Sequence, residues 1–442
     1  MACIAASGHT LRVSTAVEAP SRSATSNSGI VRVALALAYI SSATIPWNGW
    51  KYGLRPGDAF LLLALLVFFA ADLGRVWPKL PPWVWQFGAL IFLVTILHEV
   101  LPTDPFYLEH RLVISGPTVI RGNVEIQGNL QVGLKFLVPV IGLPMMYRFA
   151  LLHDPRALYR GAAAFVLGTA ISAFVGFSDL LGVTHLSLSL TKRPALGGRA
   201  PGLTLHPNFL AMTCVLALPF VLWELRSPRL RSRVFALLLL IALVVGLYAS
   251  GSRAGAGAGP AAALLSFVVM PRYRDILPTV ALLTGGAAAV VFALNPSIGA
   301  SLLHAVRLSG GDNSVSGSDS QRAIVHHQGY LDFLHSPIDG VGMQVAEEAH
   351  NVYLQALAAG GILLFVGYVI FLLSGILTSL NRMKIEPLAY PLFVSAVAGG
   401  VFVFVQAALT DRLAYVPLGL IAAMPAAGMD AAGRPTAVDE PS

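Results

Sequence analysis

Apolar runs long enough to cross or nearly cross a bilayer recur along most of the chain. They have helix length and lack the alternation of apolar and polar positions typical of a membrane β-strand. We therefore expect an all-α, polytopic membrane protein with about twelve transmembrane helices, although some runs, above all the first, are short. The helices are expected at about 31–46, 58–74, 83–101, 132–150, 161–181, 208–224, 234–249, 254–271, 276–294, 352–375, 388–409 and 413–428.

Polar stretches divide this pattern. Residues 1–30 are rich in Ser, Thr and Ala and lack an apolar core, which predicts a disordered cytoplasmic tail rather than a cleavable signal. We expect nine helices over 31–294, a large extracytoplasmic loop over 295–350, three helices over 351–428 and a second cytoplasmic tail over 429–442. Since loops longer than about 12–15 residues are usually functional or disordered, the large loop between the ninth and tenth helices is the first place to look for a site.

Composition supports the membrane class. The chain is 56% hydrophobic and only 12% charged, whereas soluble domains carry roughly 25% charged residues. Its net charge of +7 could suggest a nucleic-acid partner, but basic residues also collect in the cytoplasmic loops of membrane proteins. We therefore expect a lipid bilayer and no nucleic acid as partner. Cys3 and Cys214 fall in the tail and in an apolar run, so no disulfide is expected.

The distribution of basic residues predicts the topology. With a cytoplasmic N-terminus and alternating helices, 17 of the 29 Lys and Arg residues fall inside, many of them in short loops such as 225–233. This bias favours cytoplasmic placement of both termini. Three polar segments, at 191–208, 249–255 and 295–350, then each follow an odd number of helices. They would share the outer face, as a common site requires.

Each of these segments carries a candidate arginine. Arg199 lies in a Gly/Pro-rich loop, Arg253 is expected to open a helix, and Arg322 lies in the large loop. A helix N-terminus presents free N–H groups and attracts anions, so Arg253 suits a phosphate. The alternative is a boundary anchor for Arg253, a violation of the charge bias without consequence for Arg199 and a solvated loop charge for Arg322. Around Arg322, residues 320–335 have helical spacing and predict a short surface helix, with one face formed by Ile324, Gln328, Leu331 and Leu334.

Two histidines and an asparagine stand where predicted helices begin. His350 and Asn351 lie at the junction of the large loop with the tenth helix, and a neutral imidazole there could act as a general base near pH 7. The helix N-terminus favours the neutral form, whereas Glu347 and Glu348 favour the cation, and the sequence leaves this balance open. The alternative for His350 is a polar helix cap. His206, before the sixth helix, either starts that helix or contacts substrate.

Sequence motifs for other chemistry are absent. The chain has no Walker-type loop, no Gly-rich dinucleotide turn after a strand, no HExxH, no paired-cysteine zinc pattern and no Asp-x-Asp pair. We therefore expect no metal and no cofactor. If the substrate is a pyrophosphate, arginines would have to neutralise its charge.

Three stretches, GRAPGLTLHPNFLAM at 198–212, SGSRAG at 250–255 and GVGMQVAEEAHNVYLQALAAGGILLF at 340–365, resemble the O-antigen ligase and O-antigen polymerase superfamily of bacterial envelope proteins. The number of helices and the position of the long loop are similar too. The resemblance implies transfer of a glycan from an undecaprenyl pyrophosphate donor to a glycan or lipid acceptor, at the outer face of the bacterial cytoplasmic membrane.

The resemblance also implies residue roles. His350 would activate the acceptor hydroxyl, while Arg253 and Arg322, assisted by Arg199, would bind the lipid pyrophosphate. Attack at the anomeric carbon would expel the lipid pyrophosphate with inversion and without a metal. Asn351 and His206 are further candidates for substrate binding. The same motifs fit a ligase and a polymerase.

Two other classes compete with a transferase. A lipid-linked glycan transporter or flippase fits the number of helices equally well, but the helix centres carry almost no ionisable residues, which transporters usually place near the midplane. A scaffold protein leaves several polar features on one face unexplained. One departure from the family is the segment 102–131, whose β-branched and glycine residues predict a small hairpin that could shape the acceptor side.

Overall fold

The computed structural model describes residues 28–48, 55–72, 77–112, 128–192, 195, 198–273, 313–346 and 349–425. Every regular element in these ranges is helical, which confirms the all-α class. The α-helices are α1 (Ser28–Thr44), α2 (Pro56–Ala71), α3 (Pro82–Val100), α4 (Pro105–Glu109), α5 (Asn129–Leu137), α6 (Leu143–His153), α7 (Ala157–Leu180), α8 (Leu186–Thr191), α9 (Pro207–Leu225), α10 (Leu230–Ser250), α11 (Arg253–Val269), α14 (Asn313–His335), α15 (Val352–Arg382), α16 (Ala389–Phe402) and α17 (Arg412–Ala423).

Short π and 3-10 turns join some of these helices. The π turn η3 (Val138–Gly142) connects α5 to α6 without a break. The 3-10 turns are η4 (Pro271–Tyr273), η5 (Met343–Val345) and η6 (Val403–Val405).

Within the described residues, six helical segments are long and apolar enough to cross a membrane, so this is a membrane protein. They are α3, the continuous Asn129–His153 segment, α7, α9, α10 and α15. Five shorter apolar helices accompany them: Gly29–Thr44, Pro56–Ala71, Arg253–Val269, Ala389–Val405 and Arg412–Ala423. The span expected at 276–294 and nearly all of both tails lie outside the described residues, so the number of about twelve stays a prediction.

Helix α9 forms the centre of the bundle. It is apolar all round, and every residue from Asn208 to Leu222 is buried, as expected for a helix without a polar face. It contacts α7, α10, α11 and α16. By contrast, α10 leaves about half of the Leu237, Leu238 and Ile241 side chains exposed, which suits contact with lipid.

Helix α15 is interrupted near its start, and this break positions the residues before it. Gly361 has a left-handed backbone (φ 60°), and a Cβ there would lie 2.3 Å from the Ile338 carbonyl carbon. Only glycine allows so close a backbone approach. The loop 337–342 packs against α15 at this break. Val341 N–H donates to the Ala358 carbonyl at 2.8 Å, and Ile362 N–H donates to the Pro337 carbonyl at 2.9 Å.

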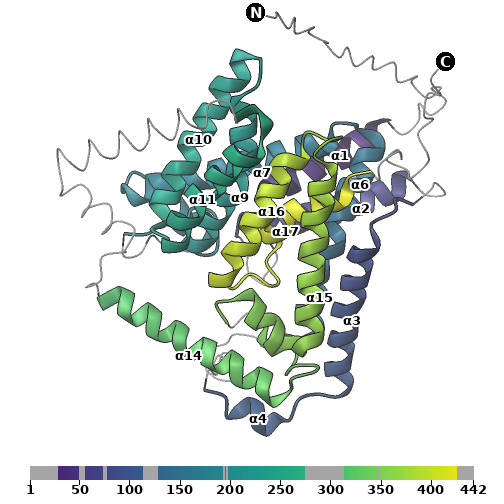
Figure 1. Cartoon of the computed structure of the whole chain (residues 1–442), viewed down its shortest axis with the longest axis vertical. Helices are drawn as coiled ribbons and strands as arrows, with labels where there is room; N and C mark the ends of the chain where they lie inside the picture. The colour runs from purple at the N-terminus through teal and green to yellow at the C-terminus, as the bar shows by residue number, and fades with distance from the viewer. Residues whose placement is uncertain are drawn as a thin grey trace, which may run out of the picture.

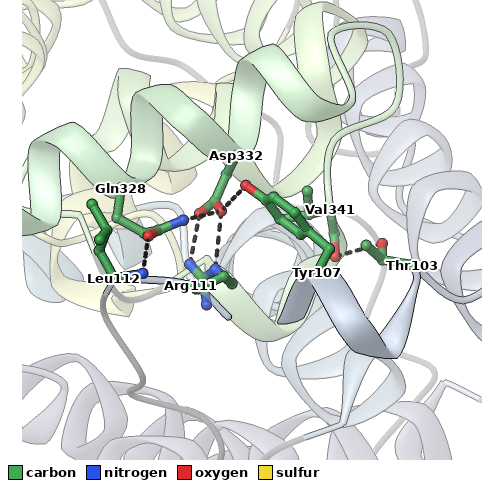
Figure 2. A network of polar contacts seen from close by, with 7 residues as sticks. All are labelled: Thr103, Tyr107, Arg111, Leu112, Gln328, Asp332 and Val341. Carbon is green, nitrogen blue, oxygen red and sulfur yellow. Dashed lines mark hydrogen bonds and ion pairs between the residues drawn. The ribbon is translucent and has the colours of Figure 1, made fainter. Parts of the chain in front are cut away.

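Helix α14 lies with α4 beyond one end of the bundle, at the lower edge of Figure 1. A buried network centred on Asp332 holds it there (Figure 2). Arg111 donates from Nε and Nη2 to the Asp332 carboxylate at 2.9 and 2.6 Å, and the Tyr107 hydroxyl donates to it at 2.9 Å. Gln328 Nε2 donates to the same carboxylate at 2.8 Å, and Leu112 N–H donates to Gln328 Oε1.

This network corrects one prediction. The helix expected at 320–335 is present and begins earlier, but the predicted face is only partly right, because Ile324 and Leu334 are about half exposed. Gln328, a member of the predicted face, is nearly inaccessible to solvent, and so is Asp332, which the prediction did not include. The buried guanidinium of Arg111, on the segment that follows α4, pairs with Asp332, and this side of α14 therefore faces inward.

The predicted hairpin at 102–131 is tested only in part. Its beginning forms helix α4, whose first turn is capped by Asp104: the carboxylate accepts from Phe106 N–H at 2.9 Å. Residues 113–127 lie outside the described ranges.

Candidate functional site

Arg199, Arg253 and Arg322 line one cavity of about 380 Å³, although they come from three distant parts of the chain. We call it the arginine cavity; its wall also includes Asn208, Gly251, Ser252, Ala254 and Val405. The sequence predicted that these three segments converge at one end of the bundle, and the structure brings them together. Three guanidinium groups around one space make a strongly anion-attracting site.

The turn between α10 and α11 orients Arg199. Arg199 Nε donates to the Ser250 carbonyl at 2.9 Å, and its Nη2 donates to Asn208 Oδ1 at 2.7 Å. Gly251 closes α10 in a left-handed conformation (φ 51°), and a Cβ there would lie 2.9 Å from Arg199 Cγ. The turn therefore needs glycine both for its backbone and for the space that Arg199 occupies.

Arg253 is the first residue of α11, as predicted. Ser252 caps the helix, because its hydroxyl accepts from Gly255 N–H at 3.3 Å. The positive end of the helix dipole thus points to the arginine cavity and adds to the charge of the arginines.

A second cavity of about 290 Å³ contains both predicted histidines. We call it the histidine cavity; its wall includes His206, His350, Gln355, Gln406, Arg55 and Asp411. His206 lines this cavity, whereas Asn208 lines the arginine cavity. Likewise, Gln406 lines the histidine cavity and its neighbour Val405 lines the arginine cavity. The first turn of α9 and residues 405–406 therefore form the partition between two adjoining cavities.

His350 lies half-buried just before α15. Burial lowers the pKa of its imidazole below the ordinary value of 6.5, and electrostatic interaction with Arg322 and His326 lowers that pKa further. Neutral imidazole is therefore the dominant form near pH 7. Glu347 and Glu348, the acids weighed against it, lie outside the described residues. Because the charge of Arg322 acts on His350, the two cavities are electrostatically linked.

The other two predicted polar residues cap helices. Asn351 Oδ1 accepts from the N–H groups of Tyr353 and Leu354 at 2.9 and 3.1 Å, so the capping role belongs to Asn351 rather than His350. His206 Nδ1 accepts from Asn208 N–H at 3.1 Å and caps α9. Both side chains have structural roles, and their contact with substrate stays a prediction.

Sequence reasoning missed the charges that border the histidine cavity. Arg55, at the start of α2, forms a two-pronged ion pair with Asp411, at the start of α17, with distances of 2.6 and 2.9 Å. Arg412 pairs in turn with Asp58. All four side chains are buried. The signal in the sequence was the adjacent acid and base, Asp411 and Arg412, directly before an apolar run.

Three buried arginines outside the arginine cavity are held in ion pairs. Arg55 and Arg412 are paired with the carboxylates of Asp411 and Asp58, and Arg111 with that of Asp332. Their charges are thus balanced within the fold. The arginines of the arginine cavity stand out because they gather around one open space.

The sequence matches no protein-family model and no curated protein.

Proposed function

We propose that this protein is a glycosyltransferase at the outer face of the bacterial cytoplasmic membrane. It moves a glycan from a polyprenyl pyrophosphate donor of the undecaprenyl type to an acceptor hydroxyl. The acceptor oxygen bonds to the anomeric carbon as the bond from that carbon to the pyrophosphate oxygen breaks. His350 takes the hydroxyl proton, and polyprenyl pyrophosphate leaves with the bonding electron pair. The anomeric configuration is inverted, and no metal takes part.

The observation that carries this proposal is the arginine cavity beside a histidine held neutral. A pyrophosphate gains negative charge as it leaves, and guanidinium groups fixed around it stabilise that charge more in the transition state than in the ground state. The N-terminus of α11 contributes in the same direction. A base must be unprotonated to accept a proton, and the lowered pKa of His350 satisfies this need at pH 7.

In this proposal the donor and the acceptor bind in the two cavities on either side of the partition. The pyrophosphate of the donor would occupy the arginine cavity. The anomeric carbon of the donor glycan would lie at the partition formed by the first turn of α9 and residues 405–406. The acceptor would approach from the histidine cavity, where His350 lies. The apolar outer surface of α10 offers the membrane contact that a lipid-linked donor requires.

The test uses purified protein in liposomes with a lipid-pyrophosphate-linked glycan on the side of the site. His350→Ala should reduce the transfer rate by roughly a hundred-fold or more, as expected for loss of a general base, without weakening donor binding. Arg253→Ala should weaken donor binding and also lower the transfer rate at saturating donor, because its guanidinium stabilises the leaving pyrophosphate. His327→Ala is the matched control, because His327 lies exposed on α14 and should keep full activity.

Two results would contradict the proposal. One is full transfer activity in His350→Ala. The other is movement of labelled lipid-linked glycan across the bilayer with no transfer to any acceptor, which would instead support a transporter.

A further inference from the structure

Three polar atoms in residues that line the histidine cavity are buried and have no hydrogen-bond partner in the part of the chain that the structure describes. They are His350 Nδ1, Gln355 Nε2 and Gln406 Oε1. Gln355 is 0% exposed and Gln406 2% exposed. Burying a polar group without a partner is unfavourable, so such groups mark places where a ligand supplies the missing bond.

The hydrogen bonds of Gln355 fix which end of its amide faces the cavity. Gln355 Oε1 accepts from Leu409 N–H at 3.1 Å, so the oxygen is occupied and the NH₂ group is left to donate. Gln406 leaves its oxygen to accept. Together the two amides present one donor and one acceptor.

Three charged side chains line the same cavity, and two of them form an ion pair. Arg55 and Asp411 bind each other through two hydrogen bonds, and the third, Lys135, acts electrostatically on Asp411. The cavity therefore differs in kind from the neighbouring one, where three arginines gather. A group that both donates and accepts, without charge, satisfies the two amides, and adjacent hydroxyls on a sugar ring have this property.

We propose that the histidine cavity binds the acceptor as a neutral sugar. Gln355 donates to the oxygen of one ring hydroxyl, and Gln406 accepts the hydrogen of a neighbouring one. These contacts orient a further hydroxyl toward His350. The proposal rests on the proposed function and deepens it: Gln355 and Gln406 select the acceptor, whereas the arginines hold the donor.

The test measures binding without activity. Ala407 lines the histidine cavity and Ala254 lines the arginine cavity, and both are partly exposed. Each is changed to Cys in a Cys3→Ala background; the thiol of Cys214 is buried. Labelling by a thiol reagent is followed with methyl glucoside, methyl mannoside or inorganic pyrophosphate at millimolar concentration.

We expect a methyl glycoside to slow labelling of Ala407→Cys about ten-fold once it occupies most of the sites, and to leave Ala254→Cys unaffected. Pyrophosphate should do the reverse. Adding Gln355→Leu or Gln406→Leu should abolish protection by the glycoside. Protection of Ala254→Cys by pyrophosphate in the same variants shows that they are folded.

Three results would overturn the acceptor proposal: no protection of Ala407→Cys by either glycoside, protection of it by pyrophosphate instead, or glycoside protection that survives both glutamine substitutions. Failure of pyrophosphate to protect Ala254→Cys in the parent chain would count against the donor site, and hence against the proposed function. The two failures are therefore distinguishable.

Discussion

His350 lies between two influences that both favour its neutral form. Its side chain is half-buried, and electrostatic interaction with Arg322 and His326 opposes a positive charge on the ring. Its position directly before α15, whose cap is Asn351, leaves its ring free from a capping role. At this scale the chemistry depends on one pKa and on the charges that set it.

The first prediction concerns the pH dependence of transfer. Since the pKa of His350 lies below 6.5, the rate at saturating donor should be constant near pH 7 and fall only at lower pH, as the ring gains its proton. Arg322→Gln removes one positive charge and raises that pKa, so the acid limb should move to higher pH. Arg229→Gln, an exposed change at the far end of α10, should not move it. An acid limb unchanged in Arg322→Gln would contradict this assignment.

The second prediction concerns the turn that holds Arg199. Gly251→Ala places a methyl group against Arg199 Cγ and forces a left-handed backbone on alanine, which costs about 1–2 kcal/mol. We expect weaker binding of pyrophosphate, measured by calorimetry. Gly257→Ala is the matched control: a Cβ there meets nothing within 4 Å, and alanine favours helix over glycine by about 1 kcal/mol. Equal pyrophosphate affinity in the two variants would show that the turn does not position Arg199.

At the scale of elements, α14 carries Arg322 to the site, and a buried polar network helps to hold this helix in place. Arg111 and Asp332 are almost completely buried, and Tyr107 stacks on His335 with ring centroids 3.6 Å apart. The break in α15 at Gly360 and Gly361 lets the loop after α14 pack against α15. Both features place α14 relative to the cavities.

The third prediction follows from this arrangement. Asp332→Asn leaves the Arg111 guanidinium buried without its counter-charge, which costs about 3–5 kcal/mol. Backbone amides of α14 should then exchange hydrogen faster, and pyrophosphate affinity should fall because Arg322 is displaced. Glu109→Gln makes the same change of charge on exposed α4 and should alter neither measurement. Unchanged hydrogen exchange of α14 in Asp332→Asn would contradict the role of the Arg111–Asp332 pair in holding this helix.

At the scale of the whole molecule, one end of the bundle collects the starts of five helices. Residues at or just before the beginnings of α2, α9, α11, α15 and α17 line the two cavities. The Arg55–Asp411 pair joins α2 to α17, close to the two ends of the described chain. Among them, the N-terminus of α11 lies at the arginine cavity, where its dipole favours an anionic ligand.

The fourth prediction concerns the orientation of this end. In a Cys3→Ala background, Glu109→Cys on α4 should react with a membrane-impermeant maleimide in intact cells, because charge bias puts the site outside. Arg229→Cys, exposed at the opposite end of α10, should react only after the membrane is opened. The reverse pattern would mean that the site faces the cytoplasm and would contradict the proposed localisation.

The sequence by itself determined the membrane class and all-α architecture, the helix start at Arg253 and the convergence of three arginine segments. These properties follow from local hydrophobicity and from the alternation of helices across a bilayer. Only the tertiary structure decided that α14 packs through Asp332, that Arg55 pairs with Asp411, and that Gln355 and Gln406 face the histidine cavity. The first two depend on which buried polar group meets which partner hundreds of residues away, and the third on how segments distant in sequence enclose one cavity, and no local pattern encodes either.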